Sequence, residues 1–153
     1  SSRNYILLED EVGFLKNYLK IEQLRFPDRF KFKVKIILND ETGEVMIPPL
    51  IVQPIIENCV KHAFQSMESG GEIIVQFSIQ NKTITCLVID NGIGINSARK
   101  HTKTSHNSIG VNVVKNRLAL IPGISKDPII FIDLSEEDET KHGTKVVIKI
   151  PLL

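Results

Sequence analysis

The stretch Val88-Ile89-Asp90-Asn91-Gly92-Ile93-Gly94-Ile95 decides how this chain is interpreted. The apolar, largely β-branched run that ends at Ile89 predicts a buried strand. Asp90 stands at the end of this strand, where a charged group is unfavourable unless another group pairs with it. The glycines that follow let the backbone approach a flat ligand closely, and an aspartate there can accept a hydrogen bond from an amino group on a ring. Because Asn-Gly is also a strong turn signal, the stretch by itself fits a turn and a binding site equally well.

The composition is typical of one globular domain. The chain has 153 residues, of which 42% are hydrophobic and 24% charged, with a net charge of +1. This size allows a substantial core, and this charge gives no indication of a nucleic-acid surface. The sequence contains neither an apolar run long enough to span a membrane nor a signal peptide. Cys59 and Cys86 each lie in an apolar segment, which predicts two buried free thiols rather than a disulfide or a metal pair.

Hydrophobic periodicity predicts alternating helices and strands. A long amphipathic helix is expected from about Tyr5 to Phe26, and Phe32–Ile36 with Glu44–Ile47 is expected to form a hairpin. Further expected elements are a helix from Pro48 to about Met67, strands over 72–80 and 83–89 joined at Asn81-Lys82, a helix over 109–121, and strands over 128–134 and 143–150. Residues 96–108 show no periodicity and predict a long loop that acts as a lid or binding segment. The order predicts an α+β fold, a two-layer sandwich with a mixed, mainly antiparallel sheet and helices on one face.

The helix expected from Pro48 carries a group of polar residues. Asn58, Lys61 and His62 are spaced i, i+3 and i+4, so an α-helix places them on one face. An amide oxygen can ligate Mg²⁺ without adding charge, and an ammonium offsets the charge of phosphate. The same residues are also common on an ordinary solvated helix face, which is the better interpretation of this segment alone.

Two later glycines mark possible phosphate and base contacts. Gly110 follows the long loop and precedes a predicted helix, whose N-terminus can bind phosphate. Gly143-Thr144 precedes the last predicted strand, where the Thr144 hydroxyl can donate to a ring or to an ordered water. Taken separately, a loop end and a glycine at a strand start explain both segments.

In this order, the four segments resemble the Bergerat ATP-binding fold, which DNA gyrase, the ninety-kilodalton heat-shock chaperone and sensor histidine kinases share. Over nearly the whole chain the resemblance is closer to the LytS/YehU-type sensor histidine kinases. The matching segments are 48–62 with their N box, 90–94 with their G1 box, 108–118 with their G2 box and following helix, 142–151 with their closing strand, and 11–26 with their linker helix.

The resemblance implies a role for each matching residue. It assigns Asn58 to Mg²⁺ and Asp90 to the amino group of adenine. Gly92, Gly94 and Gly110 then give the backbone room around base and phosphates, Val111 belongs to the nucleotide-binding G2 box, Lys61 and His62 line the nucleotide, Thr144 lies near the adenine, and residues 96–108 form the ATP lid. It also divides the chain into a linker helix over 1–27 and an ATP-binding domain over 28–153.

Three features depart from the related enzymes. Pro54 occupies the position, one helical turn before Asn58, where gyrase-type enzymes have a glutamate that activates water, so we expect weak intrinsic ATP hydrolysis. Glu57 is a nearby carboxylate and a possible catalytic residue, although adjacent helix positions point about 100° apart. The G2 box often has two or three glycines, and only Gly110 is present here. We expect this difference to affect closure of the lid and the affinity for nucleotide. The motif of the phosphoacceptor histidine is absent, and we expect that histidine upstream of Ser1 in a longer protein.

The resemblance therefore implies the ATP-binding catalytic domain of a two-component sensor histidine kinase. It implies Mg²⁺-ATP, a homodimer, a response regulator as partner, no nucleic acid, and a cytoplasmic domain, without membrane contact, of a membrane-anchored bacterial protein. One alternative is a degenerate module that serves dimerisation or docking without catalysis. The presence of only one glycine in the G2 box suggests this alternative. A second is an anti-sigma-factor serine kinase, which has no need of the linker helix. A Rossmann interpretation fails because neither a third glycine nor a helix follows Gly94.

Overall fold

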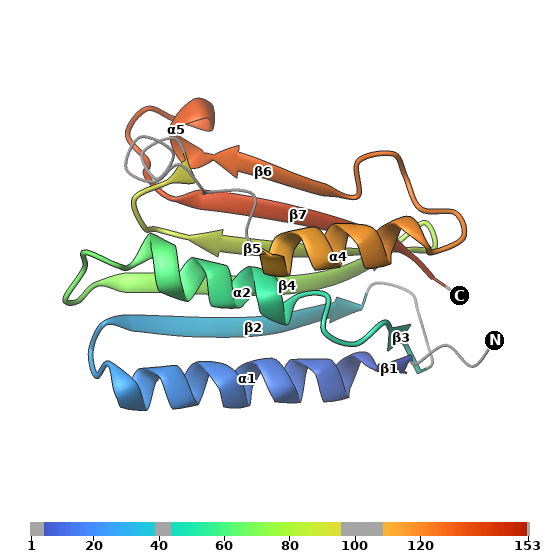
Figure 1. Cartoon of the computed structure of the whole chain (residues 1–153), viewed down its shortest axis with the longest axis horizontal. Coiled ribbons are helices and arrows are strands. Elements are labelled where there is room, and N and C mark those ends of the chain that lie inside the picture. Colours follow the sequence, from blue (N-terminus) through green and yellow to red (C-terminus); the bar gives the residue numbers. More distant parts are fainter. Residues whose placement is uncertain (1–4, 39–43, 96–108, 153) are drawn as a thin grey trace.

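A five-stranded sheet organises the structure, a computed structural model that describes residues 5–38, 44–95 and 109–152. The strand order is β2 (Phe30–Leu38), β4 (Gly71–Gln80), β5 (Thr83–Asp90), β7 (Thr144–Pro151) and β6 (Ile129–Asp133). The β2–β4 pair is parallel and the other three pairs are antiparallel. The predicted α+β fold with a mixed, mainly antiparallel sheet is therefore confirmed (Figure 1).

Side chains alternate across the two faces of the central strands. Val75 and Phe77 of β4 are register partners of Val88 and Cys86 of β5, and all four are fully buried. This alternation puts every second residue into the core beneath the helices. Both predicted free thiols, Cys59 and Cys86, are buried and unbridged, as expected.

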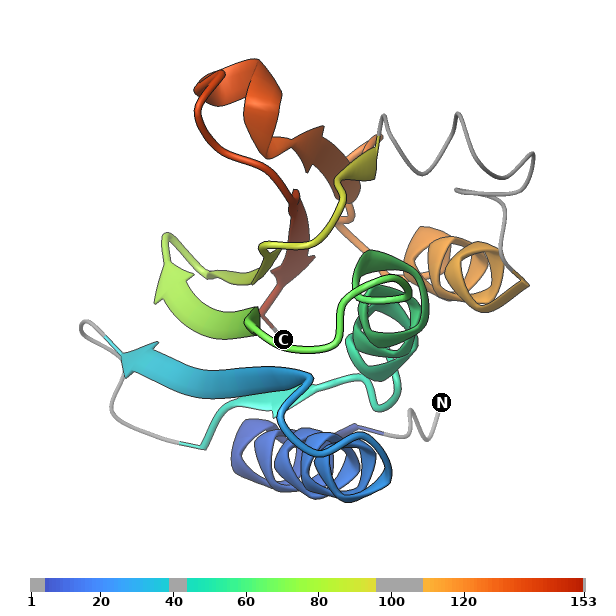
Figure 2. The same cartoon turned by 90° about the vertical axis from the view of Figure 1, so that its left-hand side faces the viewer.

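The helices cover one face of the sheet. Helix α2 (Gln53–Asn58), its π-helical continuation η1 (Cys59–Ala63) and α4 (Ile109–Ala119) lie on the same face, and α1 (Leu8–Arg25) lies beside β2 (Figure 2). α1 buries Leu15 and Leu19 completely, so it belongs to the core. A short helix, α5 (Leu134–Glu137), follows β6. Within the described residues, every helix is too short or too polar to cross a membrane.

The β4–β5 connection is a tight hairpin, as predicted. Asn81 and Lys82 both have positive φ angles, 54° and 59°, which is the conformation of the two-residue turns that match strand twist. Local sequence is sufficient here because both strands and the turn are consecutive in the chain.

Two predicted elements were wrong. The expected hairpin does not form: β3 (Met46–Ile47) pairs with β1 (Ile6–Leu7), and β2 pairs with β4 instead. Alternating residues show that a strand has one buried face, but they do not identify its neighbour. The helix expected from Pro48 begins at Gln53, because the two prolines and Leu50, with a φ of 57°, form a turn first. The predicted lid, 96–108, lies outside the described residues.

Glu11 in α1 is a buried carboxylate whose charge is poorly compensated. It is 1% exposed, and among the described residues neither carboxylate oxygen has a hydrogen-bond partner of good geometry. Burial raises its pKa above the ordinary 4.5, although the Leu50 backbone and the Arg117 guanidinium partly oppose this effect. Arg117 of α4 also donates to the Leu50 carbonyl oxygen at 2.8 Å. Glu11 thus lies where α1, the turn before α2 and α4 meet.

Replacing Glu11 by glutamine is expected to stabilise the fold at neutral pH. Because the folded-state pKa is raised, the protonated form stabilises the fold below pH 4.5, and this contribution is lost as pH rises through the folded-state pKa. The uncharged amide removes that loss, so we expect a gain of about 1 kcal/mol at pH 7, or roughly 3 °C in Tm. Thermal unfolding of both proteins at pH 4 and pH 7 tests this. An equal difference at both pH values would contradict it.

Candidate functional site

Asp90 lies at the end of β5, next to the start of β7, where its register partner is Thr144. The side chain is only 2% exposed. Its Oδ1 atom accepts hydrogen bonds from the backbone N–H groups of Gly92 at 2.9 Å and of Thr144 at 3.2 Å. Burial raises the pKa of Asp90, and these bonds and the nearby Cys59 thiol act in the opposite direction. The carboxylate is therefore held in one orientation at the end of the central strand β5.

Gly92 lets the loop after β5 pack directly on the end of η1. A Cβ atom on Gly92 would overlap the carbonyl oxygen and Cβ of Ala63. The next residue, Ile93, donates its N–H to that same Ala63 oxygen at 3.2 Å. The backbone at Gly92 therefore packs closely against η1, and the approach to a ligand predicted for this glycine stays a prediction.

Gly94 and Gly143 close the same loop from the other side. Gly94 has a φ of 84°, and a Cβ there would lie 2.7 Å from Oδ2 of Asp133. Gly143 has a φ of 124°, and its Cβ would overlap the backbone oxygen of Asp90. His142 Nδ1 lies 3.1 Å from the Gly92 carbonyl oxygen. The segment before β7 and the segment after β5 therefore fit together only with glycines at these positions.

Asn91 points away from this site and serves a structural role. Its amide donates to the Gly70 carbonyl oxygen at 2.9 Å, and its side-chain oxygen accepts from the Glu72 N–H at 2.7 Å. Gly70 belongs to the connection from η1 into β4, and Glu72 lies at the start of β4. Asn91 thus joins the start of β4 to the loop that follows β5, residues 91–95, which is called the Asp90 loop below.

The polar residues of the N-box segment are divided between two kinds of helix. Asn58 is the last residue of α2 and half-buried, whereas Lys61 and His62 belong to η1 and are exposed. The predicted common face assumed α-helical spacing, which ends at Asn58 because η1 has a wider turn. Glu57 accepts a hydrogen bond from Gln53 at 3.2 Å. It also lies near Tyr18 of α1. Burial raises the pKa of Tyr18 above its ordinary value, and the negative charges of Glu22 and Glu57 raise it further.

Gly110 and Val111 lie in the first turn of α4, which begins at Ile109. A Cβ on Gly110 would only touch Cβ of Pro54, at an ordinary 3.6 Å, so packing of the described residues does not require glycine there. Val111 is fully buried. The phosphate contact predicted for this segment remains a prediction.

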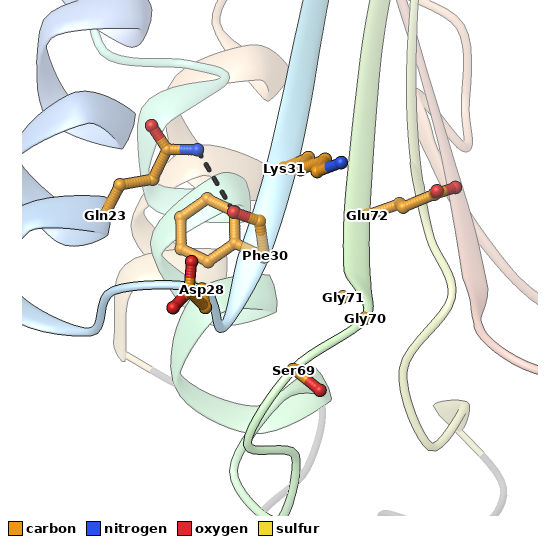
Figure 3. A pocket seen from close by; sticks show the side chains of 8 residues that line it. All are labelled: Gln23, Asp28, Phe30, Lys31, Ser69, Gly70, Gly71 and Glu72. Carbon is orange, nitrogen blue, oxygen red and sulfur yellow. Dashed lines mark hydrogen bonds between the residues drawn. The ribbon is translucent and has the colours of Figure 1, made fainter.

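Two cavities lie beside the site without joining Asp90 to Asn58. The larger, about 550 Å³, is lined by Gln23, Asp28, Phe30, Lys31, Ser69, Gly70, Gly71 and Glu72 (Figure 3). The smaller, about 380 Å³, is lined by Glu72, Ile74, Ile89, Asp90, Asn91, Leu134, Thr140, Lys141 and His142. Ile74 and Ile89 project from the sheet face opposite the helices, so this cavity opens on the other side from the Asp90 carboxylate.

The described residues contain no cluster of three or more His, Cys, Asp or Glu side chains able to hold a metal ion. Sequence reasoning missed two contributors to the site, Cys59 and Ala63. It noted Gly143 as the glycine before the last predicted strand, but not that this strand pairs with the one that ends at Asp90. Nothing in the local pattern marked Cys59 or Ala63, which reach the loop through the packing of η1.

The sequence from 48 to 153 matches the family described as "Histidine kinase-, DNA gyrase B-, and HSP90-like ATPase". The chain belongs to this ATPase family. It is 30% identical over 151 residues to "Sensor protein LytS" of Bacillus anthracis, covering 95% of this chain and 25% of that protein. It is 33% identical over 102 residues to "Sensor histidine kinase/phosphatase LytS" of Staphylococcus aureus, covering 66% of this chain and 17% of that protein. This chain thus spans about a quarter or less of the length of these relatives.

Solved structures support the same fold. The mycobacterial sensor histidine kinase MprB superposes with a TM-score of 0.63 at 15% identity, covering 98% of this chain and 97% of that one. Histidine kinase ThkA in complex with response regulator protein TrrA gives a TM-score of 0.58 at 13% identity, covering 98% and 42%. These superpositions show that the chain has the same fold, and the LytS relatives confirm the predicted resemblance to LytS-type kinases.

Proposed function

We propose that this domain binds Mg²⁺-ATP where β5 and β7 meet α2 and η1, with Asp90 as the group that recognises adenine. The observation that supports this most is a buried aspartate held by two backbone N–H groups and surrounded by Gly92, Gly94 and Gly143. An ionised carboxylate only accepts hydrogen bonds, so it suits the exocyclic amine of adenine and not a carbonyl at that ring position. A site built around such a bond discriminates strongly against a base that lacks the donor.

Asn58 is proposed as the protein ligand of Mg²⁺. Its half-buried amide on the last residue of α2 suits a hard cation, and Mg²⁺ is commonly held by few protein groups together with phosphate oxygens and water. Lys61, His62 and Thr144 are proposed to line the nucleotide, with Gly110 and Val111 in the segment nearest to the phosphates.

In the longer protein, we propose, the bound γ-phosphate is presented to a histidine upstream of this domain. An imidazole nitrogen attacks the γ-phosphorus in line, ADP leaves, and the phosphoryl group later passes to an aspartate of a response regulator. The domain contributes positioning and charge neutralisation. Weak hydrolysis is expected because Pro54 cannot act as a base, and Glu57, the possible catalytic carboxylate, is bonded to Gln53 instead.

The proposed homodimer has support from α1. Phe14, Ile21 and Leu24 are 54%, 57% and 80% exposed, and their spacing of seven and three residues forms one stripe opposite the buried face. Such a stripe suits contact with another helix of the dimeric protein. The proposal also includes three further points: a boundary between linker helix and domain at 27/28, a response regulator as partner, and a cytoplasmic location in a membrane-anchored protein. A docking module without catalysis gains no specific support.

Calorimetric titration with a non-hydrolysable ATP analogue tests the magnesium assignment. We expect Mg²⁺ to tighten binding to the wild-type chain, and Asn58→Ala to lose about tenfold of affinity in Mg²⁺ but little without it. Asn17→Ala, an exposed asparagine on α1, is the matched control. Equal Mg²⁺ dependence in wild type and Asn58→Ala would reject the ligand assignment, and no binding at millimolar nucleotide would reject the proposed function.

A further inference from the structure

Asn91, the first residue after β5, continues the pairing of β5 with β4 in an irregular way. The last register partners of the two strands are Ile73 and Asp90, so Glu72 and Asn91 are placed to form the next pair. The Asn91 N–H donates to the Glu72 carbonyl oxygen at 3.3 Å. In a regular pair of this type, the Asn91 carbonyl oxygen accepts the Glu72 N–H in return. Here the side-chain Oδ1 of Asn91 accepts it, at 2.7 Å, so a side chain takes the place of a backbone group.

The amide of Asn91 makes a second bond with the same segment. Its nitrogen donates to the Gly70 carbonyl oxygen at 2.9 Å. The residue between the two partners, Gly71, is held against the start of β2, because its N–H donates to the Arg29 carbonyl oxygen at 2.9 Å. A Cβ on Gly71 would lie only 2.9 Å from that same oxygen. The Asn91 side chain is therefore anchored to a closely packed segment.

This replacement lets the main chain leave the sheet directly after Asp90. A regular pair would keep Asn91 in the extended conformation of a strand, and the chain would run on past Asp90. Instead the chain folds back, and the Gly92 N–H donates to Oδ1 of Asp90 at 2.9 Å. The Ile93 N–H then reaches the Ala63 carbonyl oxygen of η1 at 3.2 Å. Asn91 thus lies at the point that sets the course of the Asp90 loop.

We propose that Asn91 is a positioning residue, whose side-chain amide holds the Asp90 loop in the shape that presents the Asp90 carboxylate to the amino group of adenine. This inference rests on the proposed function of the site. Asparagine suits the position because its amide supplies an acceptor for Glu72 and a donor for Gly70 at the same time. Aspartate keeps the acceptor alone, and alanine supplies neither.

Gln23 of α1 offers a matched control at the same end of the sheet. Its amide donates to the Phe30 carbonyl oxygen at 3.1 Å, and it lines the larger cavity together with Gly70 and Glu72 (Figure 3). Like Asn91, it is an amide side chain that anchors a backbone carbonyl, but its bond is to β2 and not to the Asp90 loop. Gln23→Ala is therefore expected to lower stability without changing the geometry around Asp90.

The first test measures amide hydrogen exchange by NMR in the nucleotide-free 153-residue chain. In Asn91→Ala, the amides of Glu72 and Gly92 are expected to exchange about tenfold faster. The first loses its acceptor, and the second loses the loop shape that holds it against Asp90. Each rate is divided by that of Val75, in the middle of β4, which removes any general loss of stability. Gln23→Ala is expected to leave the corrected Gly92 rate unchanged.

The second test measures base selectivity, which a merely structural role does not alter. Calorimetric titration gives the affinities for non-hydrolysable analogues of ATP and of GTP with Mg²⁺ at pH 8, which favours the ionised form of Asp90. Guanine has a carbonyl where adenine has its amino group, so the ratio of the two affinities reports how well the carboxylate is placed. Asn91→Ala is expected to lower this ratio about tenfold and Asn91→Asp about threefold, whereas Gln23→Ala keeps the wild-type ratio.

A wild-type ratio in both Asn91 variants overturns the inference, because Asn91 then serves stability alone. An unchanged corrected rate for the Gly92 amide overturns it as well, as does an equal loss of selectivity in Gln23→Ala. Circular dichroism checks folding, and if Asn91→Ala does not fold, Asn91→Asp decides both tests. The exchange test needs no nucleotide. If the Gly92 amide exchanges faster as expected but the wild-type chain binds neither nucleotide, Asn91 still holds the Asp90 loop and the proposed function falls.

Discussion

Replacing Gly143 by alanine is expected to lower the Tm of the chain by about 10 °C. A φ of 124° is strained for any residue with a side chain, and the added Cβ would overlap the backbone of Asp90. Neither the start of β7 nor the end of β5 can move without breaking sheet hydrogen bonds between them. Strain and overpacking together are expected to cost about 3 kcal/mol or more, which corresponds to that shift for a domain of this size.

Gly13 provides the matched control for this substitution. It lies inside α1, and a Cβ there meets nothing within 4 Å. Gly13→Ala is therefore expected to stabilise the helix by about 0.5–1 kcal/mol, because alanine loses less backbone entropy on folding. Thermal unfolding followed by circular dichroism measures both variants. A Gly143→Ala protein as stable as wild type would show that the two backbone segments are not held together as the structure has them.

Replacing Asp90 by asparagine is expected to weaken nucleotide binding by about a hundredfold or more while leaving the fold intact. The amide oxygen can still accept the N–H groups of Gly92 and Thr144, so the loop is expected to keep its shape. The amide nitrogen, however, turns a donor toward the amino group of adenine, and two opposed donors in a buried site cost about 2–3 kcal/mol. Calorimetric titration with the ATP analogue measures the loss.

The pH dependence of the same titration gives an independent check. Because burial raises the pKa of Asp90 and adenine is expected to require the ionised form, affinity in wild type should fall as pH is lowered through that pKa. Asp90→Asn should lack this acid limb. Glu11→Gln, the same carboxylate-to-amide change in α1, should bind as wild type does. An Asp90→Asn protein with wild-type affinity would exclude Asp90 as the group that recognises adenine.

The strand end at Asp90 and the crowded backbone after it were predictable because their signals are local, whereas the roles of these residues toward a nucleotide stay predictions. Asp90 followed by Gly92 and Gly94 marks a strand end and a backbone approach within five residues, and the structure gives each glycine a steric reason. The hairpin at Asn81-Lys82 was predictable for the same reason. Gly110 differs: the prediction rests on resemblance, and the described packing around it would tolerate a Cβ.

The sequence by itself determined the α+β class, the hydrophobic layers, the family and the residues proposed to hold the nucleotide, because these depend on periodicity and on short ordered motifs. Only the tertiary structure decided that β2 pairs with β4 and that β3 pairs with β1. It also decided that a π turn brings Ala63 to the loop after Asp90, and that Gly143 must lack a side chain. These features depend on contacts between segments far apart in the chain, which no local pattern of residues specifies.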